Sequence, residues 1–288
     1  MNVFFIPLPP LAEQHRIVSA IEKWFSLIDE IETNKESLQA AIKQTKSKVL
    51  DLAIKGKLVS QDQNDEPASE LIKRINKEKE NLIAQGKIKR PKKSDEGNAI
   101  QEFPFEIPDS WEWVKLGDVA QYKKGPFGSS LTKAMFVPES EDSFKVYEQK
   151  NAIQKDVSLG NYYISKEHFD KLKGFELLPN DIIVSCAGTV GETFVMPQNM
   201  KRGIINQALM YIRLYLPIIT PFYLIVFESM IKESSKNDSK GTAIKNIPPF
   251  EILKNYLIPL PPLAEQTRIV SKIEEVFALL DEIERELE

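Results

Sequence analysis

The chain has 288 residues, of which 42% are hydrophobic and 28% charged, and its formal net charge is −4. This composition is typical of a globular protein of one or two domains. The acidic balance argues against binding nucleic acid by bulk attraction but permits a local basic face. We expect neither a signal peptide nor a membrane span, because the most apolar stretch, residues 209–227, is interrupted by Arg213, Pro217 and Pro221.

Cysteine and histidine are scarce, which argues against disulfide bonds and zinc sites. Cys186 is the single cysteine, so no internal disulfide can form, and this suits a reducing cytoplasm. Its apolar context, "DIIVSCAG", predicts a buried core residue. With only His15 and His168 besides, we expect no zinc site and no cofactor.

A long internal repeat lies at the two ends of the chain. Residues 258–284 repeat residues 6–32, with 21 identities among 27 aligned positions and no gap. The first copy reads "IPLPPLAEQHRIVSAIEKWFSLIDEIE". The offset of 252 residues is far longer than the period of a solenoid. The repeat is therefore one duplicated element that brackets a different domain. Its prolines predict an extended lead-in, with a helix beginning after Pro10.

From Leu11 onward, apolar residues recur at alternating steps of four and three, the heptad pattern of a helix packed along its length on another helix. The pattern predicts a helix from Leu11 to about Lys55 and another from Leu263 to Glu288, with their matching seams packed on each other. The seam residues are Ile17, Ile21, Trp24, Ile28, Ile31, Leu38, Ile42, Val49 and Leu52 in the first helix, and Ile269, Ile273, Val276, Leu280 and Ile283 in the second.

The two predicted helices differ in length. The first would extend roughly 68 Å and the second roughly 39 Å, at 1.5 Å per residue. Part of the first seam is therefore left without a partner inside the chain. We expect this exposed part around Ile42, Val49 and Leu52, where it would bind a second protein.

The segment after the first helix contains a shorter one. Residues 67–86 have the apolar spacing of an amphipathic helix, with Pro67 near its start and Gly86 past its end. The basic stretch that follows fits either a solvated linker or a set of phosphate contacts. The predicted domains are a first conserved region over 1–60, a linker with a short helix over 61–102, a middle domain over 103–256 and a distal helix over 257–288.

The middle domain is predicted to be mixed α+β. Short apolar runs separated by glycine, proline and asparagine indicate strands within 111–122, 143–149, 180–188, 192–197 and 208–216, and residues 220–236 indicate a helix. From Phe103 to Phe250 there are 17 basic and 17 acidic residues, so a basic face would require the charges to segregate in the fold.

Polar loops between these strands supply candidate DNA contacts. Glycines in "QYKKGPFGSSLTK" let backbone amides approach a ligand, and its lysines and hydroxyls suit phosphate oxygens; a structural turn explains the segment equally well. Amide side chains elsewhere can bond adenine through two hydrogen bonds, although they can also satisfy backbone groups at a turn. The candidates are Lys123, Lys124, Ser129, Ser130, Lys133, Tyr147, Gln149, Lys150, Asn206, Gln207, Lys240, Thr242 and Lys245.

Enzymatic alternatives find little support. "NIPPF", at Asn246 to Phe250, differs from the Asn-Pro-Pro-aromatic motif of adenine methyltransferases by one inserted isoleucine, and no Gly-x-Gly turn for S-adenosylmethionine accompanies it. Glu112 and Lys115 would lie on opposite faces of a strand, so they could not share the metal site of a nuclease. The chain is expected to bind rather than to catalyse.

The repeated "IPLPPLAEQ", the helix running into "VLDLAIKGKLVSQDQNDEPASELIKRI", and "PFEIPDSWEWVKLGDV" together resemble the specificity subunits of type I restriction-modification systems. The resemblance covers nearly the whole chain and corresponds to the second half of such a subunit. It implies a target recognition domain flanked by two long conserved helices that form an antiparallel coiled coil and dock modification subunits.

Two functions follow from these expectations. In the first, the middle domain recognises one half of a bipartite double-stranded DNA target. Modification subunits, and through them a restriction subunit, supply methyl transfer and cleavage, and two copies of the chain form a homodimer. In the second, the chain is a coiled-coil docking protein whose middle domain no longer recognises DNA, as in a truncated or silent gene copy. The placement of five lysines discriminates between the two functions. A shared face favours DNA recognition and a scattered placement favours the docking protein: Lys123, Lys124, Lys133, Lys240 and Lys245.

Overall fold

A computed structural model describes residues 7–90, 103–237 and 247–287. The chain divides into two compact units, Met1–Asp51 with Ile273–Glu288, and Leu52–Lys272. Two long helices, α1 (Leu11–Ile54) and α8 (Leu263–Glu286), extend from one unit into the other. Both begin directly after a proline pair, as predicted, because proline cannot donate the hydrogen bonds of a helix interior. Within the described ranges, no helix is long and apolar enough to cross a membrane.

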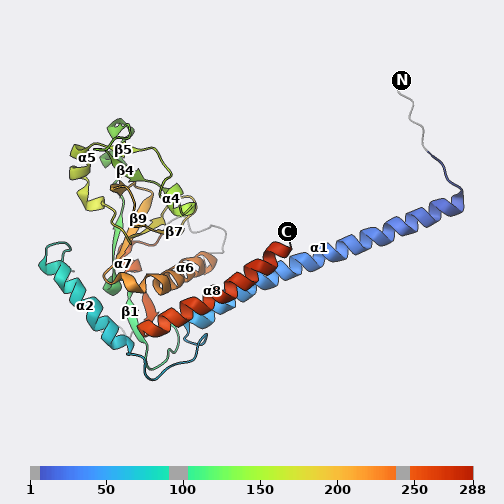
Figure 1. The fold of residues 1–288 in the computed structure, drawn as a ribbon, viewed down its shortest axis with the longest axis horizontal. Coiled ribbons are helices and arrows are strands. Elements are labelled where there is room, and N and C mark those ends of the chain that lie inside the picture. Colours follow the sequence, from blue (N-terminus) through green and yellow to red (C-terminus); the bar gives the residue numbers. More distant parts are fainter. Residues whose placement is uncertain (1–6, 91–102, 238–246, 288) are drawn as a thin grey trace. The chain divides into compact units, whose positions relative to one another are not determined.

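The first unit consists of most of α1 and the C-terminal part of α8, which run antiparallel (Figure 1). The ammonium group of Lys46 lies 2.5 Å from the Asp281 carboxylate and 2.9 Å from that of Glu284. Ile42 and Val49, one turn to either side of Lys46, are only 3% and 8% exposed. The coiled-coil pairing of the two helices thus involves the C-terminal half of α1.

The expected location of the unpartnered seam is therefore wrong. Ile42 and Val49 are buried and Leu52 is partly buried, whereas the seam residues between Ile17 and Leu38 are at least 42% exposed. The reason is the antiparallel register: the pairing of Lys46 with Asp281 and Glu284 places α8 beside the second half of α1. The repeated seams consequently do not pack on each other, and the exposed seam consists of Ile17, Ile21, Trp24, Ile28, Ile31 and Leu38.

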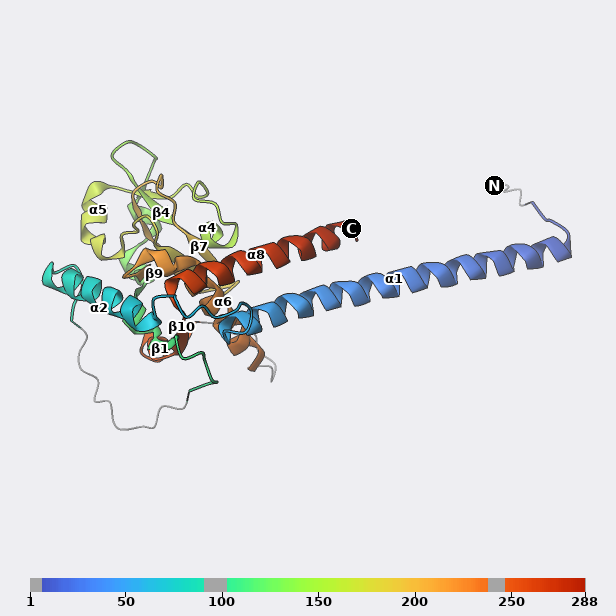
Figure 2. The same ribbon diagram turned by 60° about the horizontal axis from the view of Figure 1, so that its bottom comes forward.

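The second unit contains α2 (Ala68–Ala84) and three sheets, which Figure 2 shows from a second direction. Strands β4 and β8 pair in parallel, and the other strand pairs are antiparallel. In spatial order, the sheets are β1 (Glu112–Lys115) with β10 (Leu257–Leu260); β2 (Ala120–Lys124), β9 (Leu209–Leu214), β6 (Ile182–Ser185) and β7 (Thr193–Val195); and β3 (Phe136–Val137), β5 (Tyr163–Ile164), β4 (Phe144–Tyr147) and β8 (Gly203–Ile205).

Short helices connect these strands, and α6 is the longest of them. They are α3 (Leu116–Val119), α4 (Gln149–Ile153), α5 (Lys166–Lys171), α6 (Thr220–Asn237) and α7 (Phe250–Leu253). The mixed α+β prediction is confirmed, as are the helix at 220–236 and the short helix after Pro67. The segment 111–122 is divided by α3 because the amides of Leu116 and Gly117 donate to the carbonyls of Tyr256 and Lys254.

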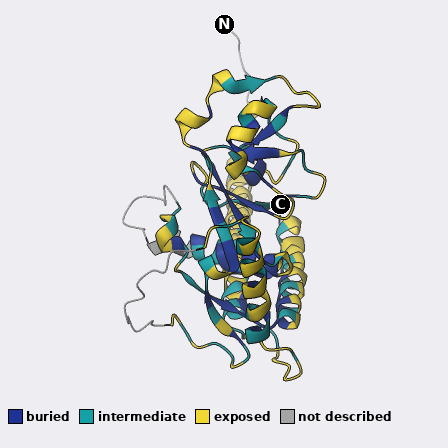
Figure 3. Cartoon of the chain, turned by 90° about the vertical axis from the view of Figure 1, so that its left-hand side faces the viewer, coloured by how far each residue is buried: buried dark blue, intermediate teal, exposed yellow. Residues whose placement is uncertain are grey.

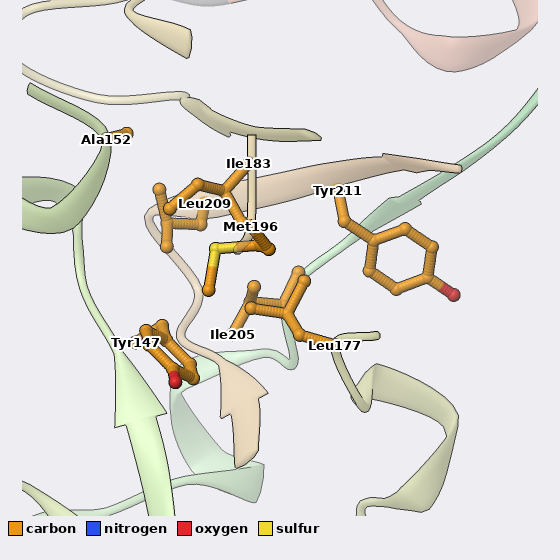
Figure 4. Close-up of a cluster of buried hydrophobic side chains, with 8 residues drawn as sticks. All are labelled: Tyr147, Ala152, Leu177, Ile183, Met196, Ile205, Leu209 and Tyr211. Atoms are coloured by element: carbon orange, nitrogen blue, oxygen red, sulfur yellow. The ribbon is translucent and has the colours of Figure 1, made fainter. Parts of the chain in front are cut away.

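The core lies where the two four-stranded sheets meet. Tyr147 and Ile205 from one sheet pack with Ile183 and Leu209 from the other (Figure 4). The rest of this cluster is Ala152, Leu177, Met196 and Tyr211. Figure 3 shows the same distribution, with buried residues (dark blue) in the strands and exposed residues (yellow) on the helices and in the loops. Side chains of β4, β6, β8 and β9 thereby hold the loops at the strand ends in a fixed arrangement.

The two copies of the repeat share local structure but differ in their surroundings. The side-chain amide of Gln14 donates to the Pro9 carbonyl at 2.8 Å, and that of Gln266 to the Pro261 carbonyl at 2.9 Å. In the second copy, β10 pairs with β1, and Glu265 is buried. In the first copy, the equivalent Glu13 pairs only with its helical neighbour Arg16 among the contacts that the structure describes.

Candidate nucleic-acid interface

Several polar loops meet at one edge of the second unit. Pairing of Lys124 with Met210 and of Ser185 with Leu209 brings the ends of β2 and β6 beside the start of β9. Pairing of Tyr147 with Ile205 brings the ends of β4 and β8 together. The segments that follow these strands, together with the start of β9, form one surface that we call the loop edge: Lys124–Ser130, Glu148–Asn151, Cys186–Gly191 and Asn206–Leu209.

The glycine-rich loop after β2 is anchored to the turn before β9. The Gly125 amide donates to the Leu209 carbonyl at 2.9 Å, and a Cβ atom at Gly125 would lie 1.8 Å from the Asn206 carbonyl oxygen. Only glycine permits this approach. Ser129 and Ser130 follow in an exposed 3-10 turn, Gly128–Ser130, and Lys133 is exposed in the next one, Lys133–Met135.

The two lysines that end β2 point to opposite faces of the strand, as the alternation of side chains requires. Lys123 lies over the ring of Phe175, with 4.9 Å between its ammonium nitrogen and the ring centroid. Lys124 is exposed and borders a hollow of about 260 Å³, which Cys186, Ile247–Pro249, Phe250 and Glu251 also line. Of this pair, only Lys124 belongs to the loop edge.

Amide side chains at the loop edge are partly engaged within the chain. Gln149 donates to the Ala187 carbonyl, and the neighbouring Lys150 pairs with Glu148 at 3.0 Å. Asn206 accepts a hydrogen bond of 3.0 Å from the Ala208 amide, so it stabilises its own turn. Gln207, the next residue, is exposed. Gln207 is therefore the amide side chain best placed to meet a ligand.

Tyr147 is not a surface residue, contrary to expectation. Its side chain is 0% exposed, and its hydroxyl donates to the Lys201 carbonyl at 2.6 Å. Burial raises the pKa of this hydroxyl above its ordinary value. The last residue of β4 faces inward because it occupies the core between the two sheets. Tyr147 is thus a core residue and not a base contact.

Three candidates, Lys240, Thr242 and Lys245, lie outside the described residues, as does Asn246 of the "NIPPF" segment. Two features of the loop edge were absent from the sequence-based candidates. The first is Phe127, which is 86% exposed. The second is the turn at Gly188, where φ is +63° and Gln149 approaches. A phenylalanine between glycines, "GPFG", is the signal that could have identified the first.

The chemistry of the loop edge is that of a binding surface. Cys186 is 4% exposed, and burial raises the pKa of its thiol to about 11, so it is a protonated core residue, as its apolar context predicted. Among the described residues, no group of histidine, cysteine and acidic side chains could hold a metal ion. Amides, hydroxyls and a lysine around a close backbone turn are groups that bond base edges and phosphates.

Comparisons with known proteins identify relatives over nearly the whole chain. The chain is 31% identical over 284 residues to the type I restriction enzyme EcoAI specificity subunit of Escherichia coli, covering 94% of this chain and 46% of that protein. It is 34% identical over 252 residues to the EcoEI specificity subunit of the same species, covering 85% of this chain and 41% of that protein. The chain thus spans about half the length of these curated relatives.

A solved structure described as the "structural basis underlying complex assembly and conformational transition of the type I R-M system" contains a chain with the same fold. It matches with a TM-score of 0.53 and 21% identity, over 98% of this chain and 56% of that one. The model of the type I restriction modification DNA specificity domain matches residues 108–288, which include all ten strands that the structure describes. The chain therefore belongs to the family of type I restriction-modification DNA specificity subunits.

Proposed function

We propose that this chain recognises one half of a bipartite DNA target through the loop edge, as a specificity module that has no catalytic activity of its own. Methyl transfer and cleavage would reside on modification and restriction subunits, and the chain would act without a cofactor. The observation that carries the proposal is the convergence of an exposed lysine, hydroxyls and amides at one edge: Lys124, Ser129, Ser130, Gln149, Lys150 and Gln207. Family membership supports it.

The paired helices would supply the docking surface for modification subunits and for a second copy of the chain. The exposed seam of α1 presents six apolar side chains over about six turns, a pattern typical of a helix that packs on another. Beside it, Pro7–Pro9, Gln14, Ile17 and Val18 line an open hollow of about 650 Å³. A two-fold dimer through this seam would present two recognition domains, so its target would be palindromic.

The two copies of the repeat add a further argument for assembly. In the second copy, Glu265 bonds to Trp111 and Gln61, and Arg268 bonds to Asp65, all within the second unit. In the first copy, the side chains of the equivalent Glu13 and Arg16 are 44% and 72% exposed and bond each other. A repeated motif whose glutamate is buried in one copy and 44% exposed in the other is expected to have a partner in the assembled complex.

The proposal is tested by selection from a random duplex library with the purified chain and its modification subunit at moderate salt. Enrichment of a symmetric two-part motif supports a dimeric specificity module, and a single short motif supports one recognition domain acting alone. Gln207→Ala should lower affinity for the selected duplex about tenfold while leaving thermal unfolding unchanged, because a base contact contributes about 1–3 kcal/mol. Equal affinity of both proteins would remove Gln207 from the interface.

A docking protein without DNA recognition is the second candidate function. Two observations favour it: Lys123 and Lys124 point to opposite faces of β2, and the segment from Phe103 to Phe250 has equal numbers of acidic and basic residues. If the chain binds its modification subunit but enriches no duplex from the library, this second function is the correct one.

A further inference from the structure

The side chain of Phe127 is exposed to solvent at the loop edge. Its side chain is 86% exposed, and no aromatic or cationic partner of its ring is found among the described residues. Burial of a phenylalanine side chain stabilises a fold. The fold gains little of this stabilisation at Phe127, although the loop that carries the residue packs closely on the domain.

The exposure of the ring does not result from a loosely attached loop. Pro126 is buried, and Gly125 is fixed against Asn206 and Leu209 by a backbone hydrogen bond and by close contact. On the other side, the Ser130 amide donates to the Phe127 carbonyl at 2.8 Å. The backbone on both sides of Phe127 is therefore held in place, and the ring is presented outward in a defined position.

The surroundings of the ring determine which ligand group it suits. The turn that anchors Gly125 also carries the exposed amide of Gln207. Amide side chains recognise adenine in the major groove, where the thymine 5-methyl is the apolar group that base pairs display. An aromatic ring on a loop that is anchored to the turn carrying an amide thus matches neighbouring A·T pairs better than it matches phosphate or a purely polar surface.

We propose that Phe127 contacts the 5-methyl group of a thymine in the major groove of the target, beside the base bonded by Gln207. The inference rests on the proposed function, since it requires the loop edge to bind DNA. It assigns to the chain an apolar, sequence-determining contact in addition to the polar ones.

The test uses the full chain with its modification subunit and the duplex selected from the library. Each thymine is replaced singly by deoxyuridine, which removes only the methyl group. The wild-type complex should lose about fourfold in affinity at one thymine, the value of one buried carbon at about 0.8 kcal/mol. Phe127→Ala should bind the thymine duplex more weakly and bind the two duplexes equally. Phe127→Leu, which stays apolar, should retain the discrimination.

Ile218→Ala is the matched control, because Ile218 is 59% exposed just beyond Leu214, at the opposite end of β9. It should leave both affinities unchanged. If the wild type enriches a site without any A·T pair, or loses affinity at no thymine, the contact does not exist although DNA recognition stands. If Phe127→Ala loses as much affinity as the wild type when thymine is replaced by deoxyuridine, the contact is likewise absent while DNA recognition stands. If Phe127→Ala instead releases the modification subunit, the ring is a protein contact, and the inference is overturned. Failure of the wild type to enrich any duplex contradicts the proposed function itself.

Discussion

The indole nitrogen of Trp111 donates a hydrogen bond of 2.9 Å to the buried carboxylate of Glu265, connecting the start of α8 to the segment before β1. The other carboxylate oxygen accepts from the side-chain amide of Gln61 at 2.6 Å. Glu265 is 1% exposed. This residue therefore joins the second copy of the repeat to the segment before β1 through a buried hydrogen bond, and to Gln61 through a partly buried one.

Removing this carboxylate should destabilise the second unit. Glu265→Ala leaves the indole N–H of Trp111, which is 3% exposed, buried without its acceptor, and this typically costs about 1–3 kcal/mol. Chemical denaturation, monitored by tryptophan fluorescence, should detect the change in the free energy of unfolding. Glu13→Ala is the control, because Glu13 occupies the same position of the first copy and its carboxylate is exposed. Equal effects of the two substitutions would contradict the structural difference between the copies.

The same carboxylate predicts a dependence of stability on pH. Burial raises the pKa of Glu265 above its ordinary 4.5, against the opposing hydrogen bonds from Trp111 and Gln61. The folded state therefore binds the proton more tightly than the unfolded state, and this contribution to stability is full below pH 4.5. It is lost as the pH rises through the raised pKa of the folded state.

Glu265→Gln provides the measurement, since glutamine does not titrate. The free energy of unfolding of the wild type, relative to that of the variant, should fall as the pH rises above 4.5 and then become constant. Denaturant titrations at closely spaced pH values give this difference directly. A difference that increases with pH would mean that the hydrogen bonds dominate over burial.

The exposed seam of α1 predicts the mode of self-association. Ile21→Asp with Ile28→Asp should abolish the dimer, because both side chains lie in the seam and a carboxylate there would be desolvated without a partner. Multi-angle light scattering at micromolar concentration measures the mass. A monomeric wild type would already contradict the dimer.

The matched control is Ser19→Asp with Ser26→Asp. These positions are also seven residues apart, but they lie on the opposite side of the helix, and both are exposed. The control should remain dimeric with the same added charge. Ile42→Asp should instead disturb the pairing within the chain, since Ile42 is 3% exposed beside Lys46.

Gly125 should be intolerant of any side chain. A Cβ atom would lie 1.8 Å from the Asn206 carbonyl oxygen, so Gly125→Ala must displace either the loop or the turn that carries Gln207. We expect a loss of about 1–3 kcal/mol in unfolding free energy, the usual range for overpacking, together with weaker DNA binding. Gly128→Ala is the control within the same loop, because nothing lies within 4 Å of the added atom. Normal stability and binding of Gly125→Ala would disprove the close packing.

Cys186 should be unreactive in the folded protein. The thiolate is the reactive form, and burial raises the thiol pKa to about 11, so almost none is present at pH 8. Labelling with a maleimide should proceed only at the rate of unfolding, and addition of denaturant should accelerate it strongly. Rapid labelling of the native protein would show that the hollow beside Lys124 opens to solvent.

Residue patterns alone were enough to predict the family, the α+β class, the position of most strands and the two long helices. Heptad spacing, the alternation of side chains along strands and a proline pair before each long helix are local signals. Each depends on residues that are close together in the sequence. The repeat was equally plain, since identity between residues 6–32 and 258–284 needs no structure. The sequence also indicated the glycines and amide side chains that form part of the loop edge.

Which of these residues face solvent depends on how distant parts of the chain pack together, and residue patterns did not predict it. The register between α1 and α8 depends on long-range pairs such as Lys46 with Asp281. Because of this register, the exposed part of the seam lies in the N-terminal half of α1 and not around Ile42 and Val49. Burial of Tyr147 depends on the second sheet that covers it, and the exposure of Phe127 depends on the anchoring of Gly125 to Asn206. Periodicity specifies which face of an element is apolar, but what covers that face is set by contacts between residues far apart in the chain.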